Sequence, residues 1–147
     1  MRAPPVFTAL APIPGSGLLC IEDNPVNALL LQEFLGRLLG LQVLLADSGA
    51  QGLELARTQR PWALLLDLVL PDMGGLAVLA QLRADPLTRD LPVVVISAVA
   101  DHHSLAAVWA LGARAVWTKP LDFSRLEQML VQALPEMAVV ARCTGKP

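Results

Sequence analysis

Short apolar runs that alternate with helix-length segments constrain the fold of this chain more than any other feature. The runs LLCI (18–21), WALLLD (62–67) and LPVVVIS (91–97) are apolar almost throughout, instead of alternating between polar and apolar residues. Strands of this kind are typical of a parallel sheet whose two faces are both covered by helices. LQVLLA (41–46) and ARAVWTKP (113–120) supply two further runs, so the sequence predicts a sheet of five strands.

A helical segment follows each of these runs. The first begins with Asn24 as a candidate N-cap and Pro25 at the first helical position, and Gly40 is its expected stop. The others are expected over residues 48–61, 75–85, 104–111 and 121–134. Since consecutive parallel strands are joined by right-handed crossovers, this order predicts an α/β fold, a doubly wound (βα)5 sandwich of the flavodoxin-like type.

The composition suits one compact domain. The chain of 147 residues is 54% hydrophobic and 16% charged, which argues against disorder, and we expect a domain over 17–135 with tails at 1–16 and 136–147. The net charge is −2 and the basic residues are scattered, so no nucleic-acid partner is expected. No apolar run reaches the roughly 18 residues that span a bilayer and no signal peptide is recognisable, so we expect no membrane contact and a cytoplasmic location. Cys20 and Cys143 form neither a disulfide framework nor a metal-binding spacing.

The sequence leaves the roles of several other side chains open. Those at helical spacing in the first helix serve either the core or a partner contact: Val26, Leu30, Leu31, Phe34, Leu35 and Leu38. Trp62 is expected to pack at the bottom edge of the sheet. Trp109 is expected to pack in the core, with a contact to a partner as the alternative. His102 and His103 are adjacent and do not share a helix face, so we expect them on the surface and not at a metal.

Polar residues gather where the apolar runs end. Glu22 and Asp23 follow the first run, Asp67 ends the third, Ser97 ends the fourth, and Lys119 lies near the end of the last. In open parallel sheets, ligands bind outside the carboxyl ends of the strands. The sequence therefore predicts three carboxylates, one hydroxyl and one ammonium on the same rim.

Such a group has a definite chemistry. Two carboxylates about 4 Å apart repel each other by roughly 4 kcal/mol at an effective dielectric of about 20, so either one is protonated or a divalent cation lies among them. A set of oxygen donors favours a hard ion such as Mg²⁺ (or Mn²⁺). With the metal and Lys119 to neutralise the incoming oxygens and Ser97 to donate a hydrogen bond, Asp67 is a competent nucleophile toward phosphorus.

Four motifs resemble the receiver domain of two-component response regulators. They are IEDN (21–24), LLLDLVLP (64–71), ISA (96–98) and TKP (118–120), in the order and spacing of that family. The resemblance covers roughly residues 17–135. It implies a signalling domain and not an enzyme: one that accepts a phosphoryl group, in a Mg²⁺-dependent way, from a histidine kinase or histidine phosphotransfer protein.

The resemblance also implies a role for each site residue. It makes Asp67 the phosphoacceptor. The metal ligands that it implies are Glu22, Asp23, Asp67 and the backbone carbonyl of Val69. Ser97 and Lys119 correspond to the residues that bind the phosphoryl group and switch the domain, and Pro120 to a cis-proline. The face formed by 104–111, 113–120 and 121–134 is where a downstream partner or a second copy is expected.

The sequence departs from the family pattern at two positions. Val116 stands where the family commonly has Tyr or Phe, and Trp117 beside it is expected to face the opposite side of the strand. The usual aromatic switch is therefore in doubt. Gly74 stands where the family often has Asp, and we expect this to affect only the loop. A further feature lies within the family's range: Val69 and Val99 offer no group to orient an attacking water, which predicts slow loss of the phosphoryl group.

Two other functions compete with the phosphoacceptor hypothesis. A pseudo-receiver would keep the fold as a phosphorylation-independent protein-binding module, and Val116 is the one feature in its favour. A phosphatase or phosphotransferase would turn over through an aspartyl phosphate. Such enzymes usually carry a second carboxylate two residues after the nucleophile, where this chain has Val69, and they enclose small substrates with a cap insertion that this sequence lacks.

Overall fold

A parallel sheet of five strands forms the centre of the molecule. The computed structural model describes residues 17–38, 40–98 and 102–135. Its strands are β1 (Leu18–Ile21), β2 (Val43–Ala46), β3 (Ala63–Asp67), β4 (Val93–Ser97) and β5 (Ala115–Thr118), in the spatial order β2-β1-β3-β4-β5. All neighbouring strands pair in parallel, which confirms the predicted doubly wound α/β fold. The predicted tails at 1–16 and 136–147 lie outside the described residues.

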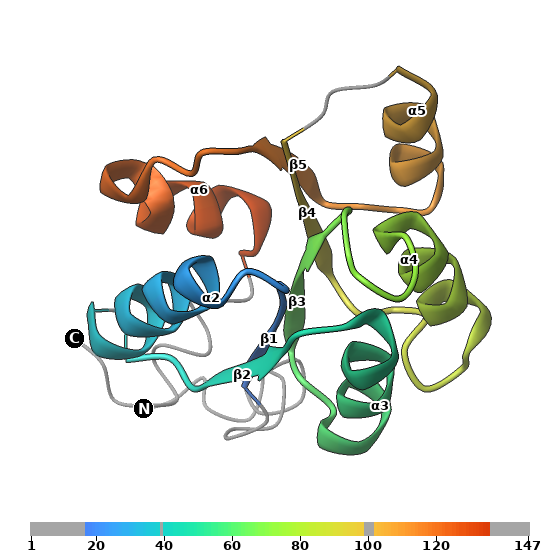
Figure 1. Ribbon diagram of the computed structural model, residues 1–147, viewed down its shortest axis with the longest axis horizontal. Coiled ribbons are helices and arrows are strands. Elements are labelled where there is room, and N and C mark those ends of the chain that lie inside the picture. The colour runs from blue at the N-terminus through green and yellow to red at the C-terminus, as the bar shows by residue number, and fades with distance from the viewer. Residues whose placement is uncertain (1–16, 39, 99–101, 136–147) are drawn as a thin grey trace, which may run out of the picture.

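Helices cover both faces of this sheet (Figure 1). They are α2 (Pro25–Gln32) with its continuation η1 (Glu33–Leu38), α3 (Gly49–Gln59), α4 (Gly75–Ala84), α5 (His102–Ala110), and η2 (Phe123–Arg125) with α6 (Leu126–Ala133). Figure 1 shows α2 and α6 on one side of the sheet and α3, α4 and α5 on the other. The three-layer arrangement explains why the central strands have no solvent-facing side.

Two apolar cores result, one on each side of the sheet. Every residue of β1, β3 and β4 is buried, as their unbroken apolar runs predict. The core under α2 and α6 contains Leu18, Cys20, Leu31, Leu35, Leu65, Trp117, Leu126 and Leu130. The core under α3, α4 and α5 contains Leu19, Ile21, Leu64, Leu66, Val78, Leu79 and Leu82. Trp62 is buried, as expected, and Trp117 and Val116 pack on opposite sides of β5, also as expected.

The first helix departs from the prediction in its second half. Asn24 caps it as predicted, because its side chain accepts hydrogen bonds from the Val26 and Asn27 N–H groups. After Gln32, however, the chain continues as π-helix from Glu33 to Leu38 instead of as α-helix. The structure also separates the apolar residues of this helix, since Leu31 and Leu35 are buried whereas Val26, Leu29 and Leu30 are exposed.

The position of Trp109 is a second difference from the prediction. Its side chain is 51% exposed, so its predicted place in the core is wrong. Its neighbour Val108 is the α5 residue that is fully buried in the core under α3, α4 and α5. The side chains of His102 and His103 lie outside the described residues.

Cys20 lies in the middle of β1 and is buried. Burial raises the pKa of its thiol to about 12, and the negative charge of Glu22 adds to the shift. The thiol is therefore protonated at neutral pH and is held as a small apolar side chain.

Within the described ranges, no helix is both long and apolar enough to cross a membrane.

Two adjacent glycines at the start of α4 have opposite surroundings. Gly74 is the N-cap of α4 and, as a glycine, offers no side chain to accept a hydrogen bond from the first turn of the helix. A Cβ atom at Gly74 would meet nothing within 4 Å. A Cβ atom at Gly75 would lie 2.5 Å from the Asp67 carbonyl oxygen, because this turn of helix packs directly on the backbone after β3.

We therefore predict that Gly74→Asp stabilises the protein. A carboxylate N-cap and a less flexible unfolded chain together contribute about 0.5–1 kcal/mol. The free energy of unfolding, measured with urea, should rise by this amount. Gly75→Ala is the matched control and should lower it; a destabilising Gly74→Asp would contradict the prediction.

Candidate functional site

The carboxyl ends of the strands bring the predicted polar residues together. Glu22 follows β1 directly, Asp67 and Ser97 are the last residues of β3 and β4, and Lys119 follows β5. The register sets this alignment, because Asp67 pairs with Ile96 and Ser97 with Thr118 on neighbouring strands. Three of these residues are buried: Glu22, Asp67 and Ser97 are only 4%, 5% and 2% exposed. Their polar groups are therefore shielded from solvent at the carboxyl edge of the sheet.

Lys119 joins the ends of three strands. Its Nζ donates to Glu22 Oε1 at 3.0 Å and to Asp67 Oδ2 at 2.8 Å. Partial burial on its own lowers the pKa of Lys119, but the hydrogen bonds and negative charges of Asp67 and Glu22 outweigh it and raise the pKa overall. Lys119 is therefore a fixed positive charge at neutral pH.

One ammonium faces three carboxylates in this cluster. Carboxylate oxygens of Glu22, Asp23 and Asp67 all lie within 4.8 Å of one another. Burial raises the pKa of Glu22, and the charge of Asp67 adds to the shift, whereas hydrogen bonds from Lys119 and from the Asn24 N–H oppose it. The donor set is all oxygen and retains excess negative charge, so these residues fit a divalent cation such as Mg²⁺.

The loop between β3 and α4 forms one wall of the site. The Val69 N–H donates to Asp67 Oδ1 at 3.0 Å, which leaves Asp67 with one oxygen toward this loop and one toward Lys119. The Val69 side chain is 63% exposed. Val99 is the other residue that we expect to offer no group to orient an attacking water, and it lies outside the described residues.

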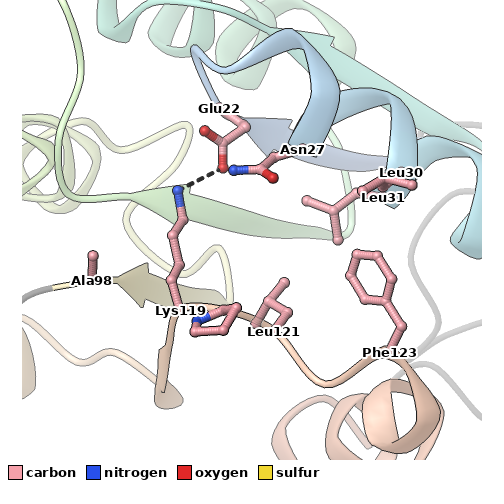
Figure 2. Close-up of a pocket in the computed structure, with 9 residues that line it drawn as sticks. Glu22, Asn27, Leu30, Leu31, Ala98, Lys119, Leu121 and Phe123 are labelled. Atoms are coloured by element: carbon pink, nitrogen blue, oxygen red, sulfur yellow. Dashed lines mark hydrogen bonds and ion pairs between the residues drawn. The ribbon is translucent and has the colours of Figure 1, made fainter.

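The opposite wall contains the Lys119–Pro120 peptide bond, which is cis. Beyond it, a cavity of about 540 Å³ opens between α2 and the segment that leads into α6. Its lining consists of Glu22, Asn27, Leu30, Leu31, Ala98, Lys119, Pro120, Leu121 and Phe123. In Figure 2, Glu22 and Lys119 lie at one end of this cavity, and Leu30, Leu31 and Phe123 lie at the other.

Sequence reasoning missed two features of this site. The apolar cavity wall was not foreseen, because Leu121 and Phe123 meet α2 only after the chain has folded across the sheet. The Asp72 carboxylate was also missed, although it accepts hydrogen bonds from the Gly49 and Ala50 N–H groups at 2.8 Å. No local pattern links residues so far apart in the chain.

The fold and the cluster together define a class of protein: an α/β signalling domain with an acidic site at the carboxyl edge of its parallel sheet. The family model for the response regulator receiver domain matches residues 18–131, and the chain belongs to this family. Receiver domains are signalling domains that interact with histidine kinases and with downstream partners.

Relatives of known identity agree with this assignment. The chain is 34% identical to protein PilH of Pseudomonas aeruginosa over 107 residues, which cover 71% of this chain and 86% of that protein. It is 30% identical to the polar-differentiation response regulator DivK of Brucella anthropi over 108 residues, 74% of this chain and 87% of DivK.

A solved structure agrees as well. The receiver domain of sensor histidine kinase PA1611 from Pseudomonas aeruginosa matches with a TM-score of 0.71 and 30% identity, over 80% of this chain and 96% of that one. That structure has a magnesium ion coordinated in its active site cleft.

The raised pKa of Glu22 makes a prediction about stability without metal. A carboxyl group whose pKa is higher in the folded state stabilises the fold below its unfolded pKa and loses that contribution as the pH rises through the folded value. At pH 7 the ionised form therefore costs stability, and Glu22→Gln should raise the melting temperature of the metal-free protein.

This gain should shrink toward pH 4, where the wild-type carboxyl group is itself protonated. Thermal melts with a chelator present, at both pH values, test the prediction. Glu33→Gln is the control, because Glu33 forms only an exposed ion pair with Arg37, at 2.9 Å. A lower melting temperature for Glu22→Gln at pH 7 would contradict the expectation.

Proposed function

We propose that this protein accepts a phosphoryl group on Asp67 from a phosphohistidine of a histidine kinase or phosphotransfer protein. The observation that carries the proposal is the contact of one ammonium, Lys119 Nζ, with both Asp67 and Glu22 in a cluster that retains excess negative charge. Mg²⁺ (or Mn²⁺) would be held by Glu22, Asp23, Asp67 and the backbone carbonyl of Val69. When bound, the metal supplies positive charge that neutralises the phosphoryl oxygens.

The residues of this chain perform the rest of the transfer. An Asp67 carboxylate oxygen forms the new bond to phosphorus as the bond from phosphorus to the donor imidazole breaks. The other ring nitrogen of that imidazole carries a proton, so the imidazole leaves as the neutral base. Lys119 Nζ turns from the carboxylates toward the phosphoryl oxygens, and the Ser97 hydroxyl donates a hydrogen bond to them. Positioning and charge stabilisation of this kind account for most of the catalysis in phosphoryl transfer.

The donor would dock where the cavity opens beside Lys119. Val26, Leu29 and Leu30 form an exposed apolar strip on α2, and the cavity extends from Leu30 to Lys119. A partner helix that covers this strip would place its phosphohistidine next to Asp67. The first-helix leucines thus divide between the two roles left open by the sequence, with Leu31 and Leu35 in the core and Leu29 and Leu30 available to a partner.

Phosphorylation would then shift the domain between two conformations. A change from 1:99 to 99:1 needs about 5.5 kcal/mol, which a doubly charged group that meets Lys119 and Ser97 is able to supply. Val116 can repack but cannot swing as a large ring does, so the response would be a repacking of β5 against α5. The face of α5, β5 and α6 would meet a downstream partner or a second copy, and α5 carries the exposed Trp109.

The proposal also covers the extent of the functional unit and its location in the cell. The functional unit would be the domain over residues 17–135, located in the cytoplasm, with no turnover of a separate substrate beyond the gain and loss of its own phosphoryl group. Val116 supports one alternative, a pseudo-receiver that binds partners regardless of phosphorylation. The complete set of Glu22, Asp67, Ser97 and Lys119 at one rim favours the phosphoacceptor.

We predict that Asp67 is the residue that takes up the phosphoryl group. Incubation with acetyl phosphate and Mg²⁺ should add about 80 Da, the mass of one phosphoryl group, to the intact protein. Asp67→Asn and chelator-treated samples should show no gain, because the nucleophile or the neutralising metal is missing. Intact-mass spectrometry measures all three samples.

A phosphorylated histidine donor provides the second arm of this experiment, since small phosphodonors do not serve every receiver. A folded wild-type protein that gains no mass from either donor would favour the pseudo-receiver. A gain that persists in Asp67→Asn would place the acceptor at another residue.

The next prediction concerns the lifetime of the phosphoryl group. The Val69 side chain is exposed at the rim and is apolar, so it cannot orient an attacking water. The wild-type phosphoryl group should persist beyond seconds after the donor is removed. Val69→Asn should shorten this lifetime several-fold and Val69→Ala should not, as followed by intact mass against time. A wild-type lifetime below seconds would rule out this account.

A further inference from the structure

The Asp72 carboxylate holds the start of α3 from a distant loop. Its Oδ1 accepts from the Gly49 N–H and its Oδ2 from the Ala50 N–H, each at 2.8 Å. These N–H groups belong to the first turn of α3, where no helical carbonyl is available to them. The hydrogen bonds from Ala50 and Gly49 hold the pKa of Asp72 below its usual range, so both oxygens act as charged acceptors at neutral pH.

A close contact accompanies these hydrogen bonds. A Cβ atom at Gly49 would lie 2.6 Å from Met73 Cγ, so the missing side chain lets the residue after Asp72 pack against the helix start. The loop is also fixed where it enters α4, because the Gly75 N–H donates to the Leu68 carbonyl at 2.8 Å. The loop after Asp67 is therefore held at its far end by α4 and in its middle by α3.

Val69 lies between Leu68 and Asp72, the two loop residues that accept these hydrogen bonds, and its side chain has little packing of its own. Its side chain is 63% exposed, and its N–H donates to Asp67 Oδ1. The position of its backbone carbonyl therefore depends on the loop and not on contacts of its side chain. Asp72, three residues further on, is the charged side chain that fastens this loop to a helix.

We propose that Asp72 is a positioning residue for the cation site. Its two hydrogen bonds to α3 hold the loop of residues 68–73 so that the Val69 carbonyl faces Glu22, Asp23 and Asp67. This rests on the proposed function, in which that carbonyl is a metal ligand. Asp72 itself does not touch the metal; it acts through the loop.

The chain offers a matched control for this role. Ser48 caps the same helix, since its hydroxyl oxygen accepts from the Gln51 N–H at 3.1 Å, but it belongs to the start of α3 and not to the loop. Ser48→Ala and Asp72→Ala both remove a cap from α3, and only Asp72→Ala releases the loop. A purely structural role for Asp72 would give the two variants the same behaviour.

The first measurement is Mg²⁺ affinity by isothermal titration calorimetry. Loss of a residue that orients a metal ligand typically weakens metal binding 10- to 100-fold, and we expect the lower end, about tenfold, for Asp72→Ala. Ser48→Ala should bind Mg²⁺ as the wild type does. Equal affinities for Asp72→Ala and the wild type would overturn the inference.

Asp72→Asn separates position from charge. It removes the negative charge but keeps one oxygen that accepts from α3, so its Mg²⁺ affinity should fall between those of the wild type and Asp72→Ala. If it binds as weakly as Asp72→Ala while its loop amides exchange as slowly as those of the wild type, the effect comes from the lost charge and the positioning role is wrong.

Amide hydrogen exchange in the metal-free protein tests the anchor independently of Mg²⁺. Asp72→Ala should speed exchange at the Val69 N–H and its loop neighbours, and Ser48→Ala should leave it unchanged. If the wild type binds no Mg²⁺, the proposed function fails and the exchange rates alone decide whether Asp72 holds the loop. Equal exchange rates in the two variants would show that Asp72 does not hold the loop.

Discussion

The bridge from Lys119 to Glu22 and Asp67 is the interaction on which the rest of the site depends. Parallel strands align their carboxyl ends, and in this chain that alignment drives buried carboxylates together at the end of β1 and β3. A lone buried carboxylate is costly, and two close ones are more so. Lys119 offsets part of that cost and ties the end of β5 to the middle of the sheet. One ammonium does not balance the charge of three carboxylates, so the fold leaves excess negative charge at the carboxyl edge of the sheet.

Most of the fold and the main site residues could be predicted, and the physical reason is the same for both. Runs such as 63–66 and 93–96 are wholly apolar because both faces of their strands are covered, and this fixes where each strand ends and which side chains meet there. Contacts set by packing between distant segments could not be predicted. Periodicity placed Leu30 and Leu31 on one helix but could not say which faces the sheet, and the link from Asp72 to Gly49 spans 23 positions.

The departures from regular structure lie close to the site. The π-helical continuation of α2 begins one turn beyond the leucines that border the cavity, and Phe34 within it packs against Phe123 with ring centroids 5.7 Å apart. That contact joins α2 to the segment after the cis Lys119–Pro120 peptide. The cavity wall is thus assembled from two elements that both pack on the same face of the sheet and meet each other through an aromatic pair.

The placement of the tryptophans gives the molecule its own optical probes. The chain has three tryptophans and no tyrosine, so its near-ultraviolet emission comes from tryptophan almost alone. Trp62 and Trp117 are 5% and 8% exposed and occupy the same core, at the start of β3 and near the end of β5, whereas Trp109 is 51% exposed on α5. A soluble quencher should therefore reduce the fluorescence of Trp109 on α5 first and leave the fluorescence of Trp62 and Trp117 in the core. Because Trp117 lies two positions before Lys119, its share of the shielded signal reports on the strand that leads to the lysine, while the quenchable signal reports on the surface of α5.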